Sequence, residues 1–353
     1  MKSGLLKLKI TEINNDSKDC LTVYFNEATG KSFNFVPGQF LTLIFNDGGT
    51  EIRRCYSIFT TQSDLPKIGI AIKKVEGGYV SKNVDELIKP GIEISSLIPM
   101  GNFNIDLLSP GSNLVLFGAG SGITPLFSIL KEYLFSHTGK TILFYQNRNE
   151  NSIIFEKELQ NLSESYKDRF SLIHILSKPG ELWGGLKGRI DKDKAKFLFN
   201  SVPVDVKENA EVFLCGPEGM MTSVTEALTE DCFNSKRIHR EHYHLSITQE
   251  SFLDVEPVDR SVTIIFDGKT YKINVPPKSS ILETALEEGI DLPFSCQIGS
   301  CSSCMAKLVS GQVLLVDQSI LSDDEIKRGF CLTCVGFPVS DQVIVNFDDP
   351  SLP

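Results

Sequence analysis

Four cysteines near the end of the chain constrain its fold and chemistry more than any other feature. Cys296, Cys301 and Cys304 form a C-x4-C-x2-C run, and Cys334 follows at a distance. This spacing is one by which thiolates hold a [2Fe–2S] cluster. Small residues in the loop, such as Gly299, let backbone N–H groups approach the sulfur atoms. The sequence therefore predicts a cluster that carries one electron at low potential.

The cysteine pattern leaves two alternatives open. Cys331 precedes Cys334 by three positions, and only one of the two can supply the fourth thiolate. A structural zinc site is the other possible metal centre, because Cys301-x2-Cys304 and Cys331-x2-Cys334 resemble the paired knuckles that zinc favours. A zinc site of that kind would leave Cys296 unused.

Length and charge restrict what accompanies the cysteine loop. A chain of 353 residues suggests two or three domains. The net charge of −10 argues against a general nucleic-acid binder, which needs a basic face. Residues 261–353 contain 12 acidic and 6 basic side chains, a net charge of −6. This excess either keeps the domain soluble or forms an acidic face that attracts a basic redox partner.

Targeting signals and cysteine usage suggest the compartment. Residues 1–10 contain lysines but no apolar core of a signal peptide. No run of about 18 apolar residues is present, so we expect no membrane-spanning helix. The nine cysteines are odd in number, which favours reduced thiols over a disulfide framework. We therefore expect a cytoplasmic protein.

The hydrophobic pattern predicts a multidomain protein. Residues 1–110 contain short strands between Gly, Pro and Asp clusters, typical of an antiparallel β-barrel. Residues 111–245 alternate strands and helices, which predicts a doubly wound α/β domain with a parallel sheet. Residues 246–260 are polar and read as a linker. Residues 261–353 predict an α+β domain that carries the cysteine loop.

The expected elements can be placed along each domain. Those of the first are strands at 5–13, 21–25, 39–45, 54–59 and 68–73, and a short helix at 85–87. Those of the second are strands at 114–117, 141–146, 172–177, 211–215 and 237–243, and helices at 124–136, 152–166, 192–201 and 219–232. Those of the third are strands at 261–266, 270–275 and 343–347, and a helix at 280–288.

A candidate flavin site lies in the first domain. Arg54-Cys55-Tyr56-Ser57 falls on an expected strand, where Arg54 and Tyr56 point to one face. One side chain offers a charge for a phosphate and the other a flat ring for stacking. By itself this tetrapeptide is weak, because Arg and Tyr are common on edge strands.

A second segment strengthens the flavin reading. Its residues are Ala71, Ile72 and Lys73, followed by Gly77, Gly78, Tyr79, Val80 and Ser81. The glycines and the serine open a short expected helix. Such a turn offers backbone N–H groups to a pyrophosphate.

A candidate nicotinamide site lies in the second domain. The first strand is followed by Gly118-Ala119-Gly120-Ser121-Gly122-Ile123-Thr124-Pro125. This is G-x-G-x-G rather than the G-x-G-x-x-G fingerprint, and no acidic residue ends the second strand. An ordinary Rossmann dehydrogenase is therefore disfavoured. The glycines still expose N–H groups at a helix start, although a close-packing glycine turn is the plain alternative.

Further candidate contacts to NAD(P)H lie at the ends of later strands. They are Cys215, Gly216, Pro217 and Met220 after the fourth strand, Glu241 and Tyr243 after the fifth, and Ser177 after the third. Arg148 and Arg189 offer guanidinium groups to a ribose 2′-phosphate. With no ribose-binding acid, they favour NADPH over NADH, although both arginines could simply be solvated.

These motifs together carry a family resemblance. Residues 5–245 resemble the ferredoxin–NADP reductase superfamily, and Cys215-Gly216-Pro217 with Met220 resembles its C-G-P-x-x-M segment. With the C-terminal domain, the whole chain resembles oxygenase-type reductases of the phenylacetyl-CoA epoxygenase reductase kind. That domain is similar to plant-type ferredoxins, which implies a β-grasp-like fold. Their L-T-C-V run matches residues 332–335 and implies that Cys334 is the fourth ligand.

The resemblance implies roles for individual residues. Arg54, Tyr56 and Ser57 would hold the phosphate, ring and N5 edge of the flavin. Residues that would line the diphosphate, and so favour FAD over FMN, are Lys73, Gly78, Val80 and Ser81. Residues expected where nicotinamide meets flavin are Ser57, Thr124, Cys215 and Tyr243.

The predicted function is that of an NAD(P)H-dependent reductase. Electrons would pass from NAD(P)H through FAD and a [2Fe–2S] cluster to an external acceptor, such as an oxygenase, hydroxylase or desaturase component. A redox sensor with little turnover is the main alternative. A binding protein that has lost its cofactors is a third, which the intact cysteines and flavin motif disfavour.

Overall fold

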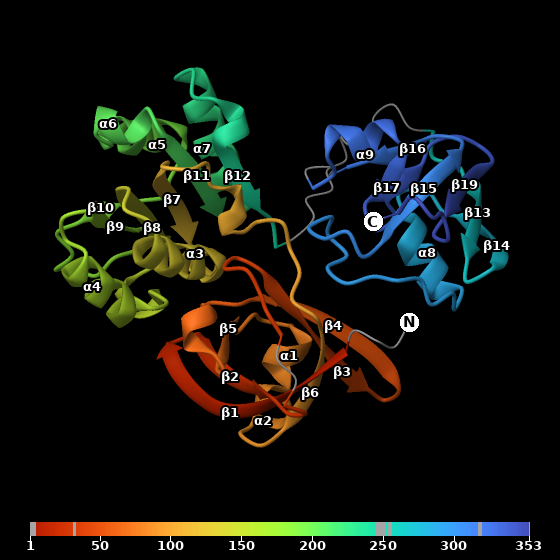
Figure 1. The fold of residues 1–353 in the computed structure, drawn as a ribbon, viewed down its shortest axis with the longest axis horizontal. Coiled ribbons are helices and arrows are strands. Elements are labelled where there is room, and N and C mark those ends of the chain that lie inside the picture. The colour runs from red at the N-terminus through yellow and green to blue at the C-terminus, as the bar shows by residue number, and fades with distance from the viewer. Residues whose placement is uncertain (1–4, 31–32, 244–251, 253–255, 317–319, 353) are drawn as a thin grey trace. The chain divides into compact units, whose positions relative to one another are not determined.

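A computed structural model describes residues 5–30, 33–243, 252, 256–316 and 320–352 (Figure 1). The chain divides into two compact units, Met1–His242 and Tyr243–Pro353. The predicted linker 246–260 falls largely outside the described residues, apart from Phe252 and residues 256–260. In the described part of the chain, no helix combines the length and apolar character needed to cross a membrane.

The first unit begins with an antiparallel barrel. Its strands are β1 (Leu5–Ser17), β2 (Cys20–Glu27), β3 (Phe40–Asp47), β4 (Thr50–Ser57), β5 (Ile68–Lys73) and β6 (Glu93–Leu97). They hydrogen-bond in the order β4-β3-β6-β1-β2-β5. A bridge between Ile58 and Ile70 joins the two outer strands and closes the sheet. Every second residue at the start of β1 is buried, as one core-facing side of a strand requires. The predicted barrel is therefore confirmed.

Short helical segments complete this barrel and its exit. They are η1 (Gln62–Asp64), α1 (Tyr79–Lys82), α2 (Val84–Leu87) and η2 (Ile105–Leu107). The predicted turn at Gly77 and Gly78 opens α1. Gly77 has a φ of 78°, a left-handed conformation that suits glycine.

The rest of the first unit is a parallel α/β domain. Its strands are β7 (Asn113–Ala119), β8 (Thr141–Asn147), β9 (Phe170–Leu176), β10 (Leu186–Lys187), β11 (Ala210–Cys215) and β12 (Ile238–Glu241). They form a parallel sheet in the order β10-β9-β8-β7-β11-β12. After β7, the chain adds β8, β9 and β10 on one side of it, and then β11 and β12 on the other. The crossover direction therefore reverses between β7 and β11, which is where such sheets bind ligands.

Helices cover both faces of this sheet, as predicted (Figure 1). They are α3 (Ile123–Ser136), α4 (Glu156–Ser165), α5 (Lys192–Ser201), α6 (Val204–Lys207) and α7 (Glu218–Glu230), with η3 (Gly120–Gly122), η4 (Glu150–Ser152) and η5 (Ser235–Arg237). The predicted helix 152–166 starts late, at Glu156. Phe155 adopts a left-handed φ of 57°, which delays the start, and its ring stacks on Phe127 at 4.5 Å.

Barrel and α/β domain contact each other within the first unit. The backbone N–H of Gly38 donates to the buried Ser128 hydroxyl at 2.9 Å. A side chain at Gly38 would meet the Phe103 carbonyl oxygen at 2.4 Å, so only glycine fits there. Lys131 forms an ion pair with Asp64 at 2.7 Å across the same boundary. These contacts fix the barrel against α3, the helix that follows the glycine turn.

The second unit is an α+β domain. Its elements are β13 (Arg260–Phe266), β14 (Lys269–Val275), α8 (Ile281–Glu287), β15 (Met305–Ser310), β16 (Val313–Leu315), α9 (Asp323–Lys327), β17 (Phe330–Leu332), β18 (Gly336–Pro338) and β19 (Val343–Asn346). The main sheet runs β14-β13-β19-β15-β17, with β13 and β19 parallel. This mixed sheet confirms the predicted fold class.

Local sequence explains the best-predicted parts of this unit. Asp267 and Gly268 both have positive φ, which a tight two-residue hairpin requires. Ser280 caps α8 by accepting the N–H of Glu283 at 3.1 Å, and the two residues form a capping box. Strands β15 to β18 were not predicted, because several are only three residues long.

Candidate functional site

The cysteine loop curls tightly on itself before β15. Gln297 and Gly299 adopt left-handed φ values of 60° and 78°. The Cys301 thiol donates to the Cys296 sulfur at 3.2 Å. Cys301 and Cys304 are almost fully buried. The loop therefore brings its thiols together in the way that a cluster requires.

Hydrogen bonds among the thiols show that all four predicted ligands converge. The thiols of Cys301 and Cys334, and then the N–H groups of Ile298 and Ser300, lower the pKa of Cys296 to about 3. Cys334 also hydrogen-bonds Cys304, which lowers the pKa of Cys304. Thiolates are the form that binds iron.

The donor set fits a two-iron cluster. Cys296 contacts both Cys301 and Cys334, and Cys334 also contacts Cys304, so the four thiols form one connected group. In a [2Fe–2S] cluster each iron takes two protein ligands. When bound, such a cluster takes up and releases single electrons.

Cys331 and Cys334 have different surroundings. The Cys331 thiol lies 3.6 Å from the Ala306 carbonyl oxygen, and burial raises its pKa to about 12. It therefore faces the sheet as an inert apolar side chain. Thr333, between the two, binds the Cys304 carbonyl oxygen through its hydroxyl at 2.9 Å and its N–H at 3.1 Å. This clamp supports Cys334 as the fourth ligand, which stays a prediction.

The predicted flavin residues lie along β4. Arg54 and Cys55 are exposed, Tyr56 is half-buried and Ser57 is buried. Burial raises the pKa of Tyr56, which keeps the phenol neutral. The Cys55 sulfur lies 3.4 Å from the Thr42 hydroxyl on β3. Arg54 and Tyr56 thus share a strand face, with a cation and an aromatic ring available to one ligand.

The predicted diphosphate segment folds as a turn at the start of α1. The Ser81 hydroxyl accepts the N–H of Val75 at 2.8 Å, and Val80 is buried. Ala71 and Ile72 are buried in the barrel, so contact with a cofactor there would involve their main chain. Lys73 is exposed, and its ammonium would lie 3.1 Å from a Cβ atom at Gly120. The flavin and nicotinamide segments therefore meet at Lys73.

The glycine turn after β7 is shaped by close packing against the end of β11. A Cβ atom at Gly122 would lie 2.2 Å from the carbonyl oxygen of Cys215. A Cβ atom at Gly216 would lie 3.0 Å from that of Ala119. A side chain at Gly122 would clash with the end of β11, and one at Gly216 would be crowded, so the glycines allow the two turns to pack closely. This packing places the two turns side by side at the switch point of the sheet.

Two side-chain hydrogen bonds fix the backbone of this turn. The Thr124 hydroxyl donates to the Ser121 carbonyl oxygen at 2.8 Å, and Thr124 is buried. The Tyr145 hydroxyl donates to the Gly120 carbonyl oxygen at 3.1 Å. Sequence reasoning missed Tyr145, because it lies in the apolar strand β8 and only the fold brings it under the turn.

The candidates that follow the fourth and fifth strands lie at the C-terminal ends of the parallel strands. Cys215 pairs with Gly118 on one side and with Glu241 on the other. Met220 of α7 belongs to the hydrophobic core that also contains Ala119 and Leu214. Pro217 is the residue that caps the start of α7. Tyr243 is the first residue of the second unit, so its predicted place beside the flavin stays a prediction.

The candidates for a 2′-phosphate site are brought to the ends of β8 and β9. The N–H of Ser177 donates to the Asn147 carbonyl oxygen at 2.9 Å, and that of Lys178 to Arg148 at 2.7 Å. Arg148 and Arg189 are exposed. Next to Arg189, the N–H of Ile190 donates to the Gln146 side chain on β8. Arg148 therefore follows β8, Ser177 follows β9 and Arg189 follows β10, three consecutive strands of the sheet, which fits a phosphate site.

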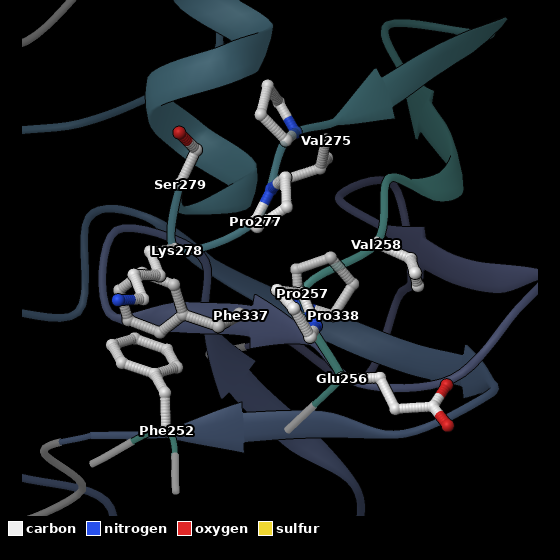
Figure 2. Close-up of a pocket in the computed structure, with 11 residues that line it drawn as sticks. Phe252, Glu256, Pro257, Val258, Val275, Pro277, Lys278, Ser279, Phe337 and Pro338 are labelled. Atoms are coloured by element: carbon white, nitrogen blue, oxygen red, sulfur yellow. The ribbon is translucent and has the colours of Figure 1, made fainter. Parts of the chain in front are cut away.

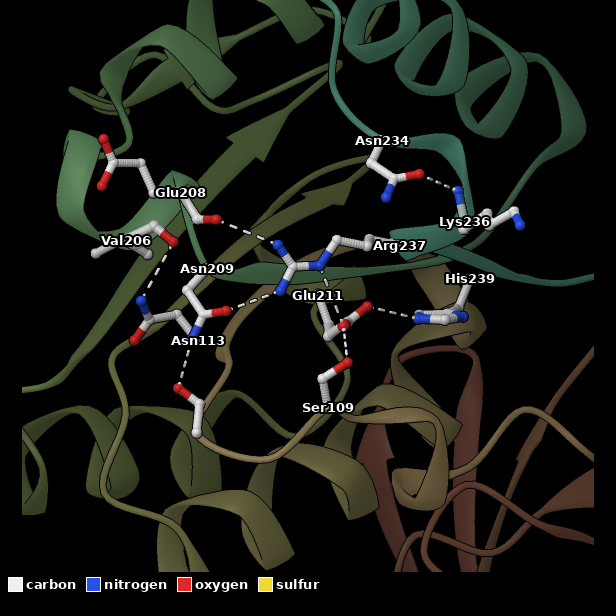
Figure 3. A network of polar contacts seen from close by, with 11 residues as sticks. Ser109, Asn113, Val206, Glu208, Asn209, Glu211, Asn234, Lys236, Arg237 and His239 are labelled. Carbon is white, nitrogen blue, oxygen red and sulfur yellow. Dashed lines mark hydrogen bonds and ion pairs between the residues drawn. The ribbon is translucent and has the colours of Figure 1, made fainter.

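A buried polar network supports this domain at the start of β11, the end of the strand opposite Cys215 (Figure 3). The carboxylate of Glu211 accepts from Ser109 at 2.7 Å and Arg237 at 3.3 Å, and lies 3.0 Å from His239. Burial alone would raise the pKa of Glu211, but these hydrogen bonds lower it. The network joins the barrel exit to β11 and β12, the strands that end at Cys215 and Glu241. A lone acid in an apolar strand was its only sequence signal.

Comparisons with known families agree with this three-part organisation. The family model for an oxidoreductase FAD-binding domain matches residues 7–105. That for an oxidoreductase NAD-binding domain matches residues 116–226. That for a 2Fe-2S iron-sulfur cluster binding domain matches residues 264–339.

Relatives match the chain nearly from end to end. A component of the 1,2-phenylacetyl-CoA epoxidase from Escherichia coli is 32% identical over 97% of both chains. The ferredoxin reductase component of 3-ketosteroid-9-alpha-monooxygenase from Rhodococcus rhodochrous is 33% identical over 96% of both chains.

Solved structures share the fold. Phthalate dioxygenase reductase aligns with a TM-score of 0.64 and 22% identity, and the alignment covers 98% of this chain and 99% of that one. The chain therefore belongs to the family of ferredoxin-reductase-like oxidoreductases that carry electrons from NAD(P)H through FAD to a C-terminal [2Fe–2S] domain.

Proposed function

We propose that the chain is the reductase component of a multicomponent oxygenase and that its cluster passes electrons to the oxygenase component. The end-to-end match to components of an epoxidase and a monooxygenase is the observation that carries this proposal. A hydroxylase or desaturase component could receive the same electrons and is tested in the same way. Nine free cysteines, four of them proposed ligands, favour a reducing cytoplasm as the location.

In this proposal, β4 and the α1 turn bind FAD. Arg54 contacts a phosphate, Tyr56 packs on the ring, and Ser57 lies at its reacting edge. Residues that line the diphosphate are Lys73, Gly78, Val80 and Ser81. FAD, when bound, supplies the conversion between two-electron and one-electron transfer. The role of the protein itself is to orient the ring and to exclude water.

The nicotinamide would bind at the switch point between β7 and β11. Backbone N–H groups of Gly120, Ser121 and Gly122 face the pyrophosphate at the start of α3, a helix of 14 residues. Thr124 and Cys215 border the nicotinamide, and Glu241 and Tyr243 complete its surroundings. No side chain has to gain or lose a proton, so alignment is the main catalytic contribution.

We further propose a preference for NADPH. Arg148 and Arg189 would bind the 2′-phosphate, with Ser177 beside them. Equilibrium titration of the native protein and of Arg148→Gln with NADPH and NADH tests this. The proposal expects the variant to lose affinity for NADPH by about tenfold, the effect of one charge-assisted pair, with little change for NADH. Equal losses for both nucleotides would show that Arg148 does not read the phosphate.

The acidic second unit is proposed to present the cluster to a basic surface of the partner. If so, turnover with the partner should fall as salt is raised from about 50 to about 300 mM, because exposed charges are screened over about 10 Å or less. Reduction of ferricyanide, a small anion, should not fall in the same way. Salt-independent turnover would argue that the acidic face serves solubility.

Turnover with purified oxygenase components tests the proposed function as a whole. The purified protein should show flavin and iron–sulfur absorption bands that NADPH bleaches within seconds. Consumption of NADPH should then depend on both the oxygenase and its substrate. Rapid bleaching without sustained transfer to any acceptor would favour the redox sensor. Absence of the two chromophores would contradict both readings.

A further inference from the structure

One residue of the predicted linker packs into the second unit. Phe252 is only 8% exposed, and its ring meets that of Phe337 edge-on, with centroids 5.0 Å apart. Figure 2 shows the two rings next to each other, beside Lys278. Burial of this aromatic side chain should stabilise the attachment of the linker to the second unit.

Residues 256–260 also pack into the second unit. Pro257 and Val258 lie against the segment after β14 and against Pro338, around a cavity of about 20 Å³ that has room for little more than a water molecule (Figure 2). Arg260 forms an ion pair with Asp341 at 2.9 Å. Phe252 and residues 256–260 of the predicted linker are therefore part of the second unit.

The anchoring strand is close in sequence to the cluster. Phe337 belongs to β18, which starts at Gly336, directly after the Cys334-Val335 pair. Val335 is itself fixed, because its carbonyl oxygen accepts the N–H of Val316 at 3.2 Å. The linker is thus fastened beside the segment that supplies the proposed fourth ligand.

We propose that Phe252 is a positioning residue for electron transfer: it fastens the linker to the ferredoxin unit and so shortens the tether between flavin and cluster. This inference rests on the proposed function, because it assumes that electrons pass between the two units. If so, a residue outside every cofactor site also determines the rate of electron transfer from flavin to cluster.

Chain length gives the size of the effect. The first unit ends at His242. From there to Phe252 a fully extended chain spans about 35 Å, and to Arg260 about 60 Å. The effective concentration of one tethered partner at the other falls roughly as the −3/2 power of tether length. Release of the chain from Phe252 as far as Arg260 should therefore lower the frequency of productive encounters about two- to threefold.

Stopped-flow reduction of the full-length holoprotein by NADPH tests the proposal. In Phe252→Ala, the flavin should be reduced at the native rate, and the cluster should then be reduced about two- to threefold more slowly. The midpoint potential and EPR spectrum of the cluster should not change. Phe252→Tyr, which keeps the ring, should behave as the native protein does. Amide hydrogen exchange of residues 256–260 should increase only in the alanine variant.

A matched control is available in the same unit. Phe266 also meets a second ring edge-on, that of Phe347 at 5.8 Å, but lies on β13 away from the linker contacts. Phe266→Ala should leave cluster reduction at its native rate. A native rate in Phe252→Ala, or equal slowing in both alanine variants, would overturn the proposal. Failure of NADPH to reduce the cluster in the native protein would instead contradict the proposed function.

Discussion

In the proposed sites, the cluster loop and the glycine turn would bind their cofactors by opposite means. The loop around Cys296 and Cys301 would supply side chains as ligands, so the residue types themselves define the site. The turn at Gly120 and Gly122 would supply backbone N–H groups, which the absence of side chains leaves accessible. A Cβ atom at Gly122 would lie 2.2 Å from the Cys215 carbonyl oxygen. Substitution should therefore remove a ligand in the first region and displace a strand end in the second.

The largest effect is expected in the cluster loop. Cys304→Ser should remove transfer to one-electron acceptors such as cytochrome c, because oxygen is a poor substitute for a thiolate ligand. Reduction of the flavin by NADPH should persist. Stopped-flow absorbance separates the two steps. Cys331→Ser is the control and should retain the cluster, at a cost of about 1–2 kcal/mol for a buried hydroxyl. Native reduction of cytochrome c by Cys304→Ser would mean that electrons bypass the cluster.

A smaller effect is expected at the glycine turn. Gly122→Ala forces the turn away from β11, so KM for NADPH should rise at least tenfold while cluster and flavin contents stay native. Gly219→Ala is the matched control, because a Cβ atom there meets nothing within 4 Å and the residue lies inside α7. That variant should be neutral or slightly more stable. An unchanged KM in Gly122→Ala would show that the turn does not bind the nucleotide.

Substitution of the buried Glu211 should lower the free energy of unfolding. Glu211→Gln keeps an acceptor for Ser109 but weakens the contacts to Arg237 and His239, so the first unit should lose about 2–3 kcal/mol near pH 7. Because the folded-state pKa of Glu211 is lowered, its stabilisation is present above the unfolded value of 4.5 and is lost as pH falls below it. Thermal unfolding of both proteins between pH 4 and pH 8 measures this. A gap that stays constant down to pH 4 would contradict the account.

The smallest effect is expected at Asp16, where substitution should raise the free energy of unfolding rather than lower it. Burial raises its pKa to about 6, although its carboxylate accepts the N–H of Phe155 at 3.0 Å. A raised carboxyl pKa costs stability as pH rises from 3.8 through 6. Because the side chain is partly exposed, Asp16→Asn should gain only about 1 kcal/mol at pH 8 and less at pH 5. Thermal unfolding at the two pH values checks this, and a loss at pH 8 would contradict it.

The contrast between the two regions also explains what the sequence could predict. Cysteine spacing, the two strands that flank Asp267-Gly268 and the helix that follows Ser280 depend on local signals, and the strands and the helix were found where expected. The late start of α4 was not predicted, because the left-handed Phe155 depends on packing against Phe127 from another element. Tyr145, Glu211 and the Phe252 anchor were missed for the same reason. Each acts through a partner that only the fold brings near.

EPR spectroscopy of the anaerobic full-length protein, before and after addition of NADPH, tests the central claim most directly. The account predicts a silent oxidised sample and, after NADPH, the signal of a reduced [2Fe–2S] cluster, with iron and acid-labile sulfide in equal amounts. A sample that contains zinc or no metal, or a cluster that dithionite reduces and NADPH does not, would contradict it.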